Sequence, residues 1–213
     1  MRGPLTKSAL AACLLFAASP PAEALTRAGA ALQKRSTARP AQRRQRRLRK
    51  PDVIYVPTPP ETVDEMLRQA RLTKGDVLFD LGSGDGRIPL AAAKQYGVRA
   101  VGIDIDQKLV EEASEMARRE GLEHLVAFRL GDMFAADLSG ATVVTLYLSD
   151  RLNVMLRPKL LRELPVGARI VSHDFRMGDW PPEKSVRVPW KNLYRTVYVW
   201  TVPPGRSYKK RKV

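Results

Sequence analysis

A short glycine-rich run, D-L-G-S-G-D-G-R at residues 80–87, holds the residue types that are best spaced for chemistry in this chain. It follows the apolar residues 77–79 and leads into 88–96, where the pattern is typical of a helix. A strand, a glycine-rich turn and a helix in this order bind nucleoside ligands in open α/β sheets. Glycine has no Cβ, so its backbone can turn tightly and approach a ligand closely. The start of the following helix adds N–H groups that lack a partner within the helix.

The spacing of the glycines narrows the kind of ligand. A dinucleotide site of the pattern G-x-G-x-x-G would need its third glycine at position 87, which is Arg87. The glycines here are Gly82, Gly84 and Gly86, and Asp80 precedes them. The resulting pattern, D-x-G-x-G-x-G, argues against a dinucleotide and favours another nucleoside ligand.

Three later segments place more groups where strands are expected to end. Asp104 ends an apolar run 18 residues after the last glycine of the loop, and a carboxylate there can accept hydrogen bonds from ribose hydroxyls. Asp132 ends the next strand-like run, 126–131, and a fourth run covers 142–148. Each feature also has a plain structural interpretation, because the glycines could form an ordinary turn and both Asp residues could cap helices.

In order and spacing, these four elements resemble motif I and the following strands of class I S-adenosylmethionine-dependent methyltransferases. The resemblance implies a Rossmann-like fold, S-adenosyl-L-methionine as cofactor, and a reactive methyl group beside the end of 142–148. It implies that Asp80 and the backbone of the glycine loop hold the methionine part, that Asp104 holds the ribose, and that Asp132 meets the adenine. The implied cofactor-binding residues are Asp80, Gly82, Ser83, Gly84, Gly86, Asp104, Ile105, Asp132 and Met133, of which Ile105 and Met133 would flank the adenine or belong to the core.

A wider pattern resembles a bacterial group similar to the mitochondrial lysine methyltransferases that act on the ATP synthase c-subunit and the adenine nucleotide translocase. It rests on Y-V-P-T-P at 55–59, on 143–148, on R-P-K-L at 157–160 and on S-H-D-F at 172–175, and it covers roughly 52–203. The resemblance implies a lysine side chain in a protein as methyl acceptor. The end of the fourth strand reads Tyr-Leu-Ser and lacks the Asn/Asp-Pro-Pro-aromatic sequence common in amide and exocyclic-amine methyltransferases, which argues against those acceptors.

A lysine acceptor needs a site that removes its charge. Its amine has a pKa near 10.4 in water and must lose a proton before it can attack a methyl group. A desolvated slot lined by hydroxyls and carbonyls disfavours the ammonium form. Tyr55 and Tyr147 are the candidates for this lining, and His173 is a candidate base or substrate-orienting residue. Packed aromatic rings and a structural histidine are the alternative interpretations of the same residues.

The charge of the chain is unevenly distributed. Of the net +15, residues 1–50 contribute 12 basic residues against one acidic residue, and 206–213 contribute five basic residues. Between them, 51–205 hold 20 basic and 21 acidic residues, so the body is close to neutral. Phosphate binding needs clustered Lys and Arg, so this balance argues against an RNA-binding face on the body. The basic ends could contact anionic lipid or nucleic acid, or could simply be solvated.

The position of the single cysteine excludes several reaction types for the body of the chain. The single cysteine, Cys13, lies far from the glycine loop, so the body has no thiol nucleophile and no Cys-ligated metal or iron–sulfur cluster. The spacing of Asp150, Asn153 and Asp174 does not support a cation site for catechol-type methylation. We therefore predict a reaction without metal and without a covalent enzyme intermediate.

The N-terminus has the layout of a targeting segment. Residues 1–7 are basic, 9–18 are apolar and 22–24 read A-E-A, which is typical of a secretory signal peptide. The apolar run is too short for a full transmembrane helix. We expect a signal or membrane-targeting segment at 1–24, and hence export or membrane association, with a mitochondrial presequence as the alternative. A basic disordered linker at 25–50, a domain at 51–205 and a basic tail at 206–213 complete the predicted organisation.

The remaining patterns predict an α/β domain. Helix-like segments alternate with strand-like segments until a final pair of strands, 185–188 and 193–202, which predicts a mostly parallel seven-stranded sheet with an antiparallel edge strand. Thr62 and Glu65 have the spacing of a capping box, and Pro158 is expected to kink or interrupt the helix after Ser149.

Three functional hypotheses remain open at this stage. The first is a protein-lysine N-methyltransferase, the second is a methyltransferase for RNA or a small metabolite, and the third is a non-catalytic module that binds the cofactor. The near-neutral body argues against RNA, and the complete set of loop glycines and acids argues against loss of catalysis.

Overall fold

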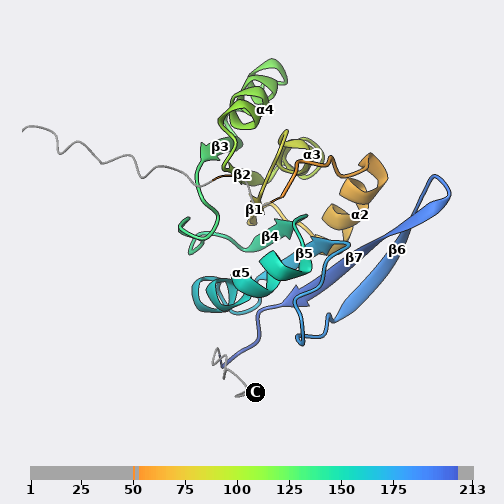
Figure 1. The fold of residues 1–213 in the computed structure, drawn as a ribbon. Helices are drawn as coiled ribbons and strands as arrows, with labels where there is room; N and C mark the ends of the chain where they lie inside the picture. The colour runs from red at the N-terminus through yellow and green to blue at the C-terminus, as the bar shows by residue number, and fades with distance from the viewer. Residues whose placement is uncertain (1–49, 51–52, 206–213) are drawn as a thin grey trace, which may run out of the picture. The chain divides into compact units, whose positions relative to one another are not determined.

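The computed structural model describes residues 50 and 53–205 (Figure 1). Four helices cover the two faces of one sheet, with three on one face and the fourth on the other. The three are α2 (Pro60–Ala70), α3 (Arg87–Tyr96) and α4 (Gln107–Arg119), and the fourth is α5 (Asp150–Glu163).

The sheet has seven strands, and its order is β3-β2-β1-β4-β5-β7-β6. The strands are β1 (Val77–Leu81), β2 (Arg99–Asp104), β3 (Val126–Leu130), β4 (Val143–Leu146), β5 (Arg169–His173), β6 (Lys184–Trp190) and β7 (Leu193–Thr201). Strands β1 to β5 are parallel, and β7 is antiparallel to both of its neighbours. The predicted mostly parallel α/β sheet is confirmed, and β6, which pairs only with β7, forms the edge.

The direction in which the sheet grows reverses at β1. The chain adds β2 and β3 on one side of β1, then crosses over and adds β4 and β5 on the other side. The connections at the carboxyl ends of β1 and β4 therefore run to opposite faces and leave a crevice, which is where open α/β sheets bind ligands. The glycine loop, residues 82–86, leaves β1 at this point.

Each face of the sheet has its own apolar core. On the first face, α2 buries Val63, Met66, Leu67 and Ala70, the same stripe that recurs along its sequence with helical spacing. This stripe packs in one cluster with side chains of β6 and β7, so the helix that precedes the sheet also anchors the final hairpin. On the second face, the buried leucines of α5 share a cluster with Trp200 of β7.

The predicted capping box does not form, and α5 is not interrupted at Pro158; packing explains both outcomes. Helix α2 begins after Pro59 without a side-chain cap, and the hydroxyl of the fully buried Thr62 has no hydrogen-bond partner in the described part of the chain. Helix α5 continues through Pro158. The proline removes one hydrogen bond to the carbonyl of Val154, which lies on a partly exposed part of the helix, while fully buried leucines hold the helix against the sheet on either side of it.

The predictions for 1–24, for 25–50 except Lys50, and for 206–213 concern residues outside the described part of the chain. Within 53–205, none of the helices has the length and apolar character needed to span a bilayer.

Gly86, at the start of α3, allows a test of how tightly the glycine loop is packed. Its φ is 80°, and a Cβ there would lie 2.4 Å from Cζ of Phe128 and 2.8 Å from Cβ of Ala113. Gly167 has a similar φ of 84°, but a Cβ there would meet nothing within 4 Å. Gly86→Ala should lower the free energy of unfolding by about 3 kcal/mol and Gly167→Ala by about 1 kcal/mol. Both substitutions force alanine into a left-handed conformation, but only the alanine at position 86 also clashes with neighbouring side chains. Urea unfolding measures both values, and equal losses would contradict this packing.

Candidate active site

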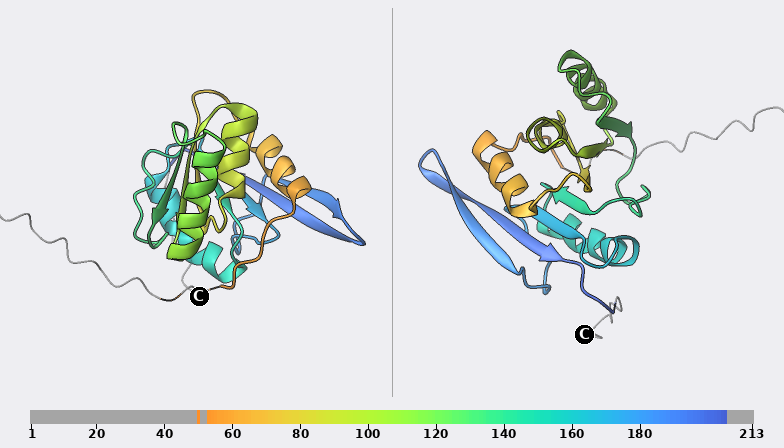
Figure 2. Two further views of the ribbon diagram at one scale, coloured as in Figure 1. Left: turned by 90° about the horizontal axis from the view of Figure 1, so that it is seen from above. Right: turned by 180° about the vertical axis from the view of Figure 1, so that it is seen from behind.

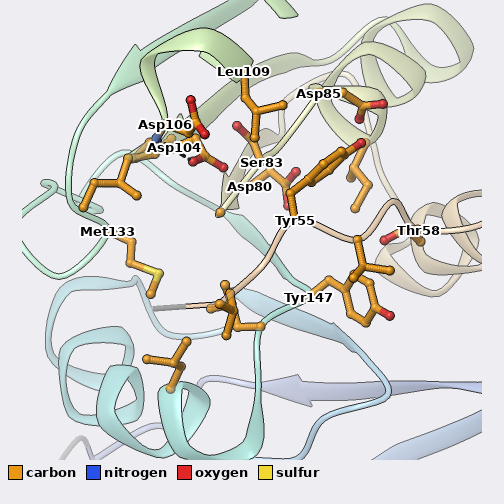
Figure 3. A pocket seen from close by; sticks show the side chains of 18 of the residues that line it. Tyr55, Thr58, Asp80, Ser83, Asp85, Asp104, Asp106, Leu109, Met133 and Tyr147 are labelled. Carbon is orange, nitrogen blue, oxygen red and sulfur yellow. Dashed lines mark hydrogen bonds between the residues drawn. The ribbon is translucent and has the colours of Figure 1, made fainter. Parts of the chain in front are cut away.

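A cavity of about 470 Å³ opens at the carboxyl ends of β1, β2 and β4 (Figure 3). We call this end of the sheet the carboxyl edge. The cavity has walls from four parts of the chain: the glycine loop, the ends of β2 and β3, the residues after β4, and the segment that precedes α2. It therefore lies at the switch point of the sheet, where the strand order predicts a binding site.

Most of the residues singled out from the sequence meet in this cavity. Tyr55 and Tyr147 line it, together with seven of the predicted cofactor-binding residues: Asp80, Gly82, Ser83, Asp104, Ile105, Asp132 and Met133. Gly84, Gly86 and His173 do not line it.

The glycine loop is tied to the end of β2. The backbone N–H groups of Gly82 and Ser83 both donate to the carbonyl of Ile103, at 2.8 and 3.1 Å. The N–H of Gly84 donates to Oδ2 of Asp104 at 2.7 Å, and the N–H of Asp106 donates to Oδ1 of Asp104 at 2.9 Å. Two backbone donors thus orient the Asp104 carboxylate at the cavity wall, and each oxygen keeps a further lone pair for a hydroxyl of a ligand.

Gly84 and Gly86 are needed for packing of the protein itself. A Cβ on Gly84 would lie 2.4 Å from the ring of Tyr55, and the same addition to Gly86 would meet Phe128. Side chains from outside the loop therefore close over these two glycines and keep them from the cavity. The cofactor-binding role of these two glycines stays a prediction, and the structure adds a role in close packing that the spacing of glycines alone does not reveal.

Asp80 is the second-to-last residue of β1 and lies at the floor of the cavity. Its side chain is buried, and its Oδ1 accepts a hydrogen bond from the Thr145 hydroxyl at 2.7 Å. Burial raises the pKa of Asp80 to about 7, the nearby charges of Asp104 and Asp85 add to the rise, and the Thr145 hydrogen bond opposes it. The floor of the cavity therefore carries a carboxyl group that titrates near neutral pH.

One wall is an extended segment, residues 53–58, which we call the strap. The Tyr55 hydroxyl points toward Asp85 (Figure 3), and burial together with the Asp85 carboxylate raises the pKa of Tyr55. Asp85 also pairs with Arg87 at 2.6 Å, and Nη1 of Arg87 donates to the carbonyl of Thr58 at 2.7 Å. The glycine loop thus contacts the strap at two points, Tyr55 and Thr58, although almost 30 residues separate the loop and the strap in the sequence.

Tyr147 and His173 form a stacked pair at the ends of β4 and β5. Their ring centroids are 3.8 Å apart, with an angle of 23° between the planes. His173 is fully buried, and its Nδ1 lies 3.3 Å from the Thr58 hydroxyl of the strap. Burial lowers the pKa of His173 to about 4, and the charge of Arg195 adds to this, whereas Asp174 opposes it.

The role of His173 as a base or substrate-orienting residue stays a prediction, and its surroundings favour the alternative of a structural histidine. The histidine lies behind Tyr147, outside the lining of the cavity, and it is neutral at physiological pH. Its contacts are those of a support for Tyr147 and for the strap.

Three residues of the site lacked a prediction. Thr145 is the one polar residue of β4, and its position directly beside Asp80 in the sheet register was the available signal. Asp85 and Arg87 lie within the glycine-rich run, and their opposite charges two positions apart are compatible with the ion pair that the structure contains. Tyr55, the strap residue that faces this pair, is distant in the sequence, and no local pattern connects it with Asp85 and Arg87.

The cavity fits a nucleoside cofactor on its own geometry. Its volume falls within the range of small-molecule sites. The Ser83 hydroxyl is buried at its wall without a hydrogen-bond partner among the described residues, and the Asp104 carboxylate is already oriented. Ile105 and Met133 add an apolar surface suited to a flat ring.

Within the described residues, no three His, Cys, Asp or Glu side chains gather as a metal site would require. Asp150 accepts from the backbone N–H of Arg176, Asn153 donates to the Ser172 hydroxyl, and Asp174 accepts from the backbone N–H of Thr196. These polar groups fasten the segment after β5 to its neighbours.

This fold and cavity define a class I S-adenosylmethionine-dependent methyltransferase, and comparison with known proteins agrees. Residues 80–184 match the family described as "ANTKMT methyltransferase domain". A protein-lysine N-methyltransferase of Saccharolobus islandicus (strain REY15A) is 40% identical over 153 residues, which are 71% of this chain and 95% of the relative. The chain belongs to this methyltransferase family.

Two further relatives have names that give different methyl acceptors, RNA in one and lysine in the other. A crystal structure of an RNA methyltransferase from Salinibacter ruber in complex with S-adenosyl-L-homocysteine shares 48% identity with a TM-score of 0.68, and the match covers 74% of this chain and 100% of that one. The adenine nucleotide translocase lysine N-methyltransferase of Mus musculus is 38% identical over 131 residues, 61% of this chain. The match spans 56% of the mouse protein's length.

The buried neutral His173 predicts a specific loss of stability in acid. Its pKa is depressed in the folded state, so its contribution is complete above the unfolded pKa of about 6.5 and disappears as the pH falls toward 4. Between pH 6.5 and 5, the wild type should lose about 1.5 kcal/mol more unfolding free energy than His173→Phe, which keeps a ring against Tyr147 but does not titrate. Urea unfolding at the two pH values measures the difference. Parallel losses in both proteins would show that His173 is not buried in its neutral form.

Proposed function

We propose that this protein transfers a methyl group from S-adenosylmethionine to the side-chain amine of a lysine in a protein substrate. The observation that carries the proposal is the switch-point cavity, which joins a nucleoside-binding wall at Asp104 to an aromatic wall at Tyr147. Lysine methylation is the activity named for relatives from both an archaeon and animals, and the archaeal match spans nearly that whole protein.

In this proposal, the cofactor lies along the carboxyl edge from β3 to β4. Asp104 accepts hydrogen bonds from the ribose hydroxyls, because its two oxygens are held in place by backbone donors. Asp132, Ile105 and Met133 surround the adenine, and Asp80 with the backbone of Gly82 and Ser83 faces the methionine part.

The acceptor lysine enters beside Tyr147. The wall here combines aromatic and aliphatic surface from Tyr147, Leu148 and Leu152 with the Tyr55 ring of the strap. Such a desolvated wall lowers the pKa of an incoming amine, because it stabilises the neutral form relative to the ammonium. The neutral His173 behind Tyr147 adds no positive charge that would repel a cationic substrate.

When bound, the cofactor supplies a methyl group on a positively charged sulfur, a good leaving group that departs with the bonding electron pair. The lysine nitrogen forms the new bond to carbon, and the amine proton goes to water. The residues of the chain therefore act by positioning the amine in line and by keeping it uncharged. No side chain has to form a covalent bond or bind a metal.

RNA is the second candidate acceptor, because the Salinibacter relative bears that name. The balance of 20 basic and 21 acidic residues in 51–205 favours the lysine proposal, since RNA binding relies on clustered positive charge. The basic segments 25–50 and 206–213 could supply such charge, so RNA has to be tested as an acceptor alongside protein.

We also propose that the protein works at a membrane. The support is the signal-like pattern of 1–24 and the basic composition of 25–50 and 206–213, which suit an anionic lipid surface. Export and mitochondrial import remain the two routes compatible with this pattern.

The raised pKa of Asp80 predicts that cofactor binding depends on pH. An ionised Asp80 complements the ammonium of the methionine part, so affinity should rise as Asp80 loses its proton near pH 7. Calorimetric titration with S-adenosylhomocysteine should show about a fivefold to tenfold gain in affinity from pH 6 to 7.5 in the wild type. In Asp80→Asn, which can still accept the Thr145 hydrogen bond, the gain should be absent. The same pH dependence in both proteins would remove Asp80 from the cofactor site.

The acceptor can be identified with cofactor carrying a labelled methyl group. The full-length protein is incubated with a protein extract and with RNA, and label that appears as methyllysine after acid hydrolysis supports the proposal. Tyr147→Ala should lower the rate about tenfold or more while affinity for S-adenosylhomocysteine changes by less than about threefold, because the acceptor loses its wall. Label released by ribonuclease would replace lysine with RNA as the acceptor and leave the cofactor assignment intact.

A further inference from the structure

The hairpin of β6 and β7 has an unusual composition. Residues 184–201 contain four basic and four aromatic residues and no acidic residue, although the body as a whole is nearly neutral. The two strands are joined by a tight turn at Lys191 and Asn192, where Lys191 has a φ of 52°. The hairpin extends beyond α2 in the views of Figures 1 and 2.

The strand register shows where the tip of this hairpin points. β5 ends at His173, which pairs with Val197, and Val197 pairs in turn with Val186. The pairing of β6 and β7 then continues for four more residues, to Trp190 opposite Leu193, which is about 13 Å. Strand β6 runs in the same direction as β5. The tip therefore projects past the carboxyl edge, the edge at which the cavity opens.

We call residues 187–195 the hairpin tip. Leu193 and Tyr194 are 62% and 57% exposed, so the tip presents apolar surface to solvent. The Arg187 guanidinium lies 4.0 Å from the ring centroid of Tyr194, and Lys191 and Arg195 lie over Trp190 at 4.9 and 4.4 Å. Arg195 also bonds to Asp174, so Arg187 and Lys191 carry most of the charge available to a partner.

We propose that the hairpin tip docks on an anionic membrane surface. Tryptophan and tyrosine prefer the interface between lipid and water, and an exposed leucine can enter its apolar side. Basic side chains add attraction to anionic headgroups. The tip combines all three, and six basic residues among 43–50 directly precede the strap in the sequence. The strap itself lies at the same edge and presents Ile54, which is 85% exposed.

The same contacts argue against single-stranded nucleic acid as the partner. Proteins that bind such strands stack bases on open aromatic faces. Here cations of the hairpin itself lie over the rings of Trp190 and Tyr194. A membrane surface needs the edges of these rings and the cations beside them, both of which remain accessible at the tip.

Docking through the hairpin tip would orient the cavity. Because the tip and the cavity mouth share one edge of the sheet, a domain held by its tip presents the strap and the cavity to the lipid headgroups. This inference concerns orientation and rests on the proposal that the protein works at a membrane. It holds for any methyl acceptor, so it can fail separately from the proposal of lysine methylation.

A fluorescent probe at the turn tests the contact directly. Asn192→Cys in a full-length Cys13→Ser background is labelled with an environment-sensitive dye, and Val166→Cys in the same background, on an exposed turn before β5, is the control. Vesicles with about one-third phosphatidylglycerol in phosphatidylcholine should shift the emission of the label at 192 to the blue and leave the label at 166 unchanged. Pure phosphatidylcholine vesicles should give a much smaller shift.

Vesicle sedimentation of matched double variants gives the second readout. Lys191→Glu with Leu193→Asn should weaken binding to the anionic vesicles about tenfold or more, because it reverses a charge and removes the inserted side chain. The control, Lys74→Glu with Val166→Asn, makes similar changes at exposed positions before β1 and β5 and should change binding less than about twofold. Equal effects of the two variants, or no shift at 192 with vesicles, would overturn the proposal. A shift at 192 with single-stranded RNA alone would assign the tip to nucleic acid.

Discussion

The hydrogen bond from the Thr145 hydroxyl to the Asp80 carboxylate joins the two strands between which the sheet reverses its direction of growth. It holds a buried acid at the point where the crevice opens, and burial of that acid is what brings its pKa close to neutrality. The glycine loop leaves β1 directly after this pair, and Tyr147 follows β4 directly after it. Both walls of the cavity therefore start from the same fixed point.

Above this point, the loop takes its shape from side chains that converge on its three glycines. A Cβ on Gly82 would meet Leu148, one on Gly84 would meet Tyr55, and one on Gly86 would meet Phe128. These three neighbours come from the segment after β4, from the strap and from β3. The loop is thus held by packing from three directions, and its backbone is left free to aim N–H groups at the carbonyl and carboxylate of β2.

The sequence was sufficient to predict the parallel strands, because each is a short, mostly apolar run, and to select seven residues that line the cavity, because acids lie at or near the ends of three of these strands. The antiparallel hairpin was also visible as a final pair of strand-like runs. The position of the strap was not, since contacts of Tyr55 with the glycine loop leave no periodic trace. The burial of His173 depends on a ring stacked from another strand, and the continuity of α5 through Pro158 depends on leucines held by the sheet. Such tertiary contacts override local patterns.

The strap has a practical consequence for the choice of boundaries in shortened versions of this protein. A chain that begins at Pro59 would keep every strand, every helix from α2 to α5 and both apolar cores. It would lack Tyr55 and Thr58, and with them one wall of the cavity and the hydrogen bond between the Thr58 hydroxyl and His173. The elements of the fold are therefore complete in a shorter stretch of chain than the one that encloses the cavity, and the secondary structure of a fragment can be a poor guide to its activity.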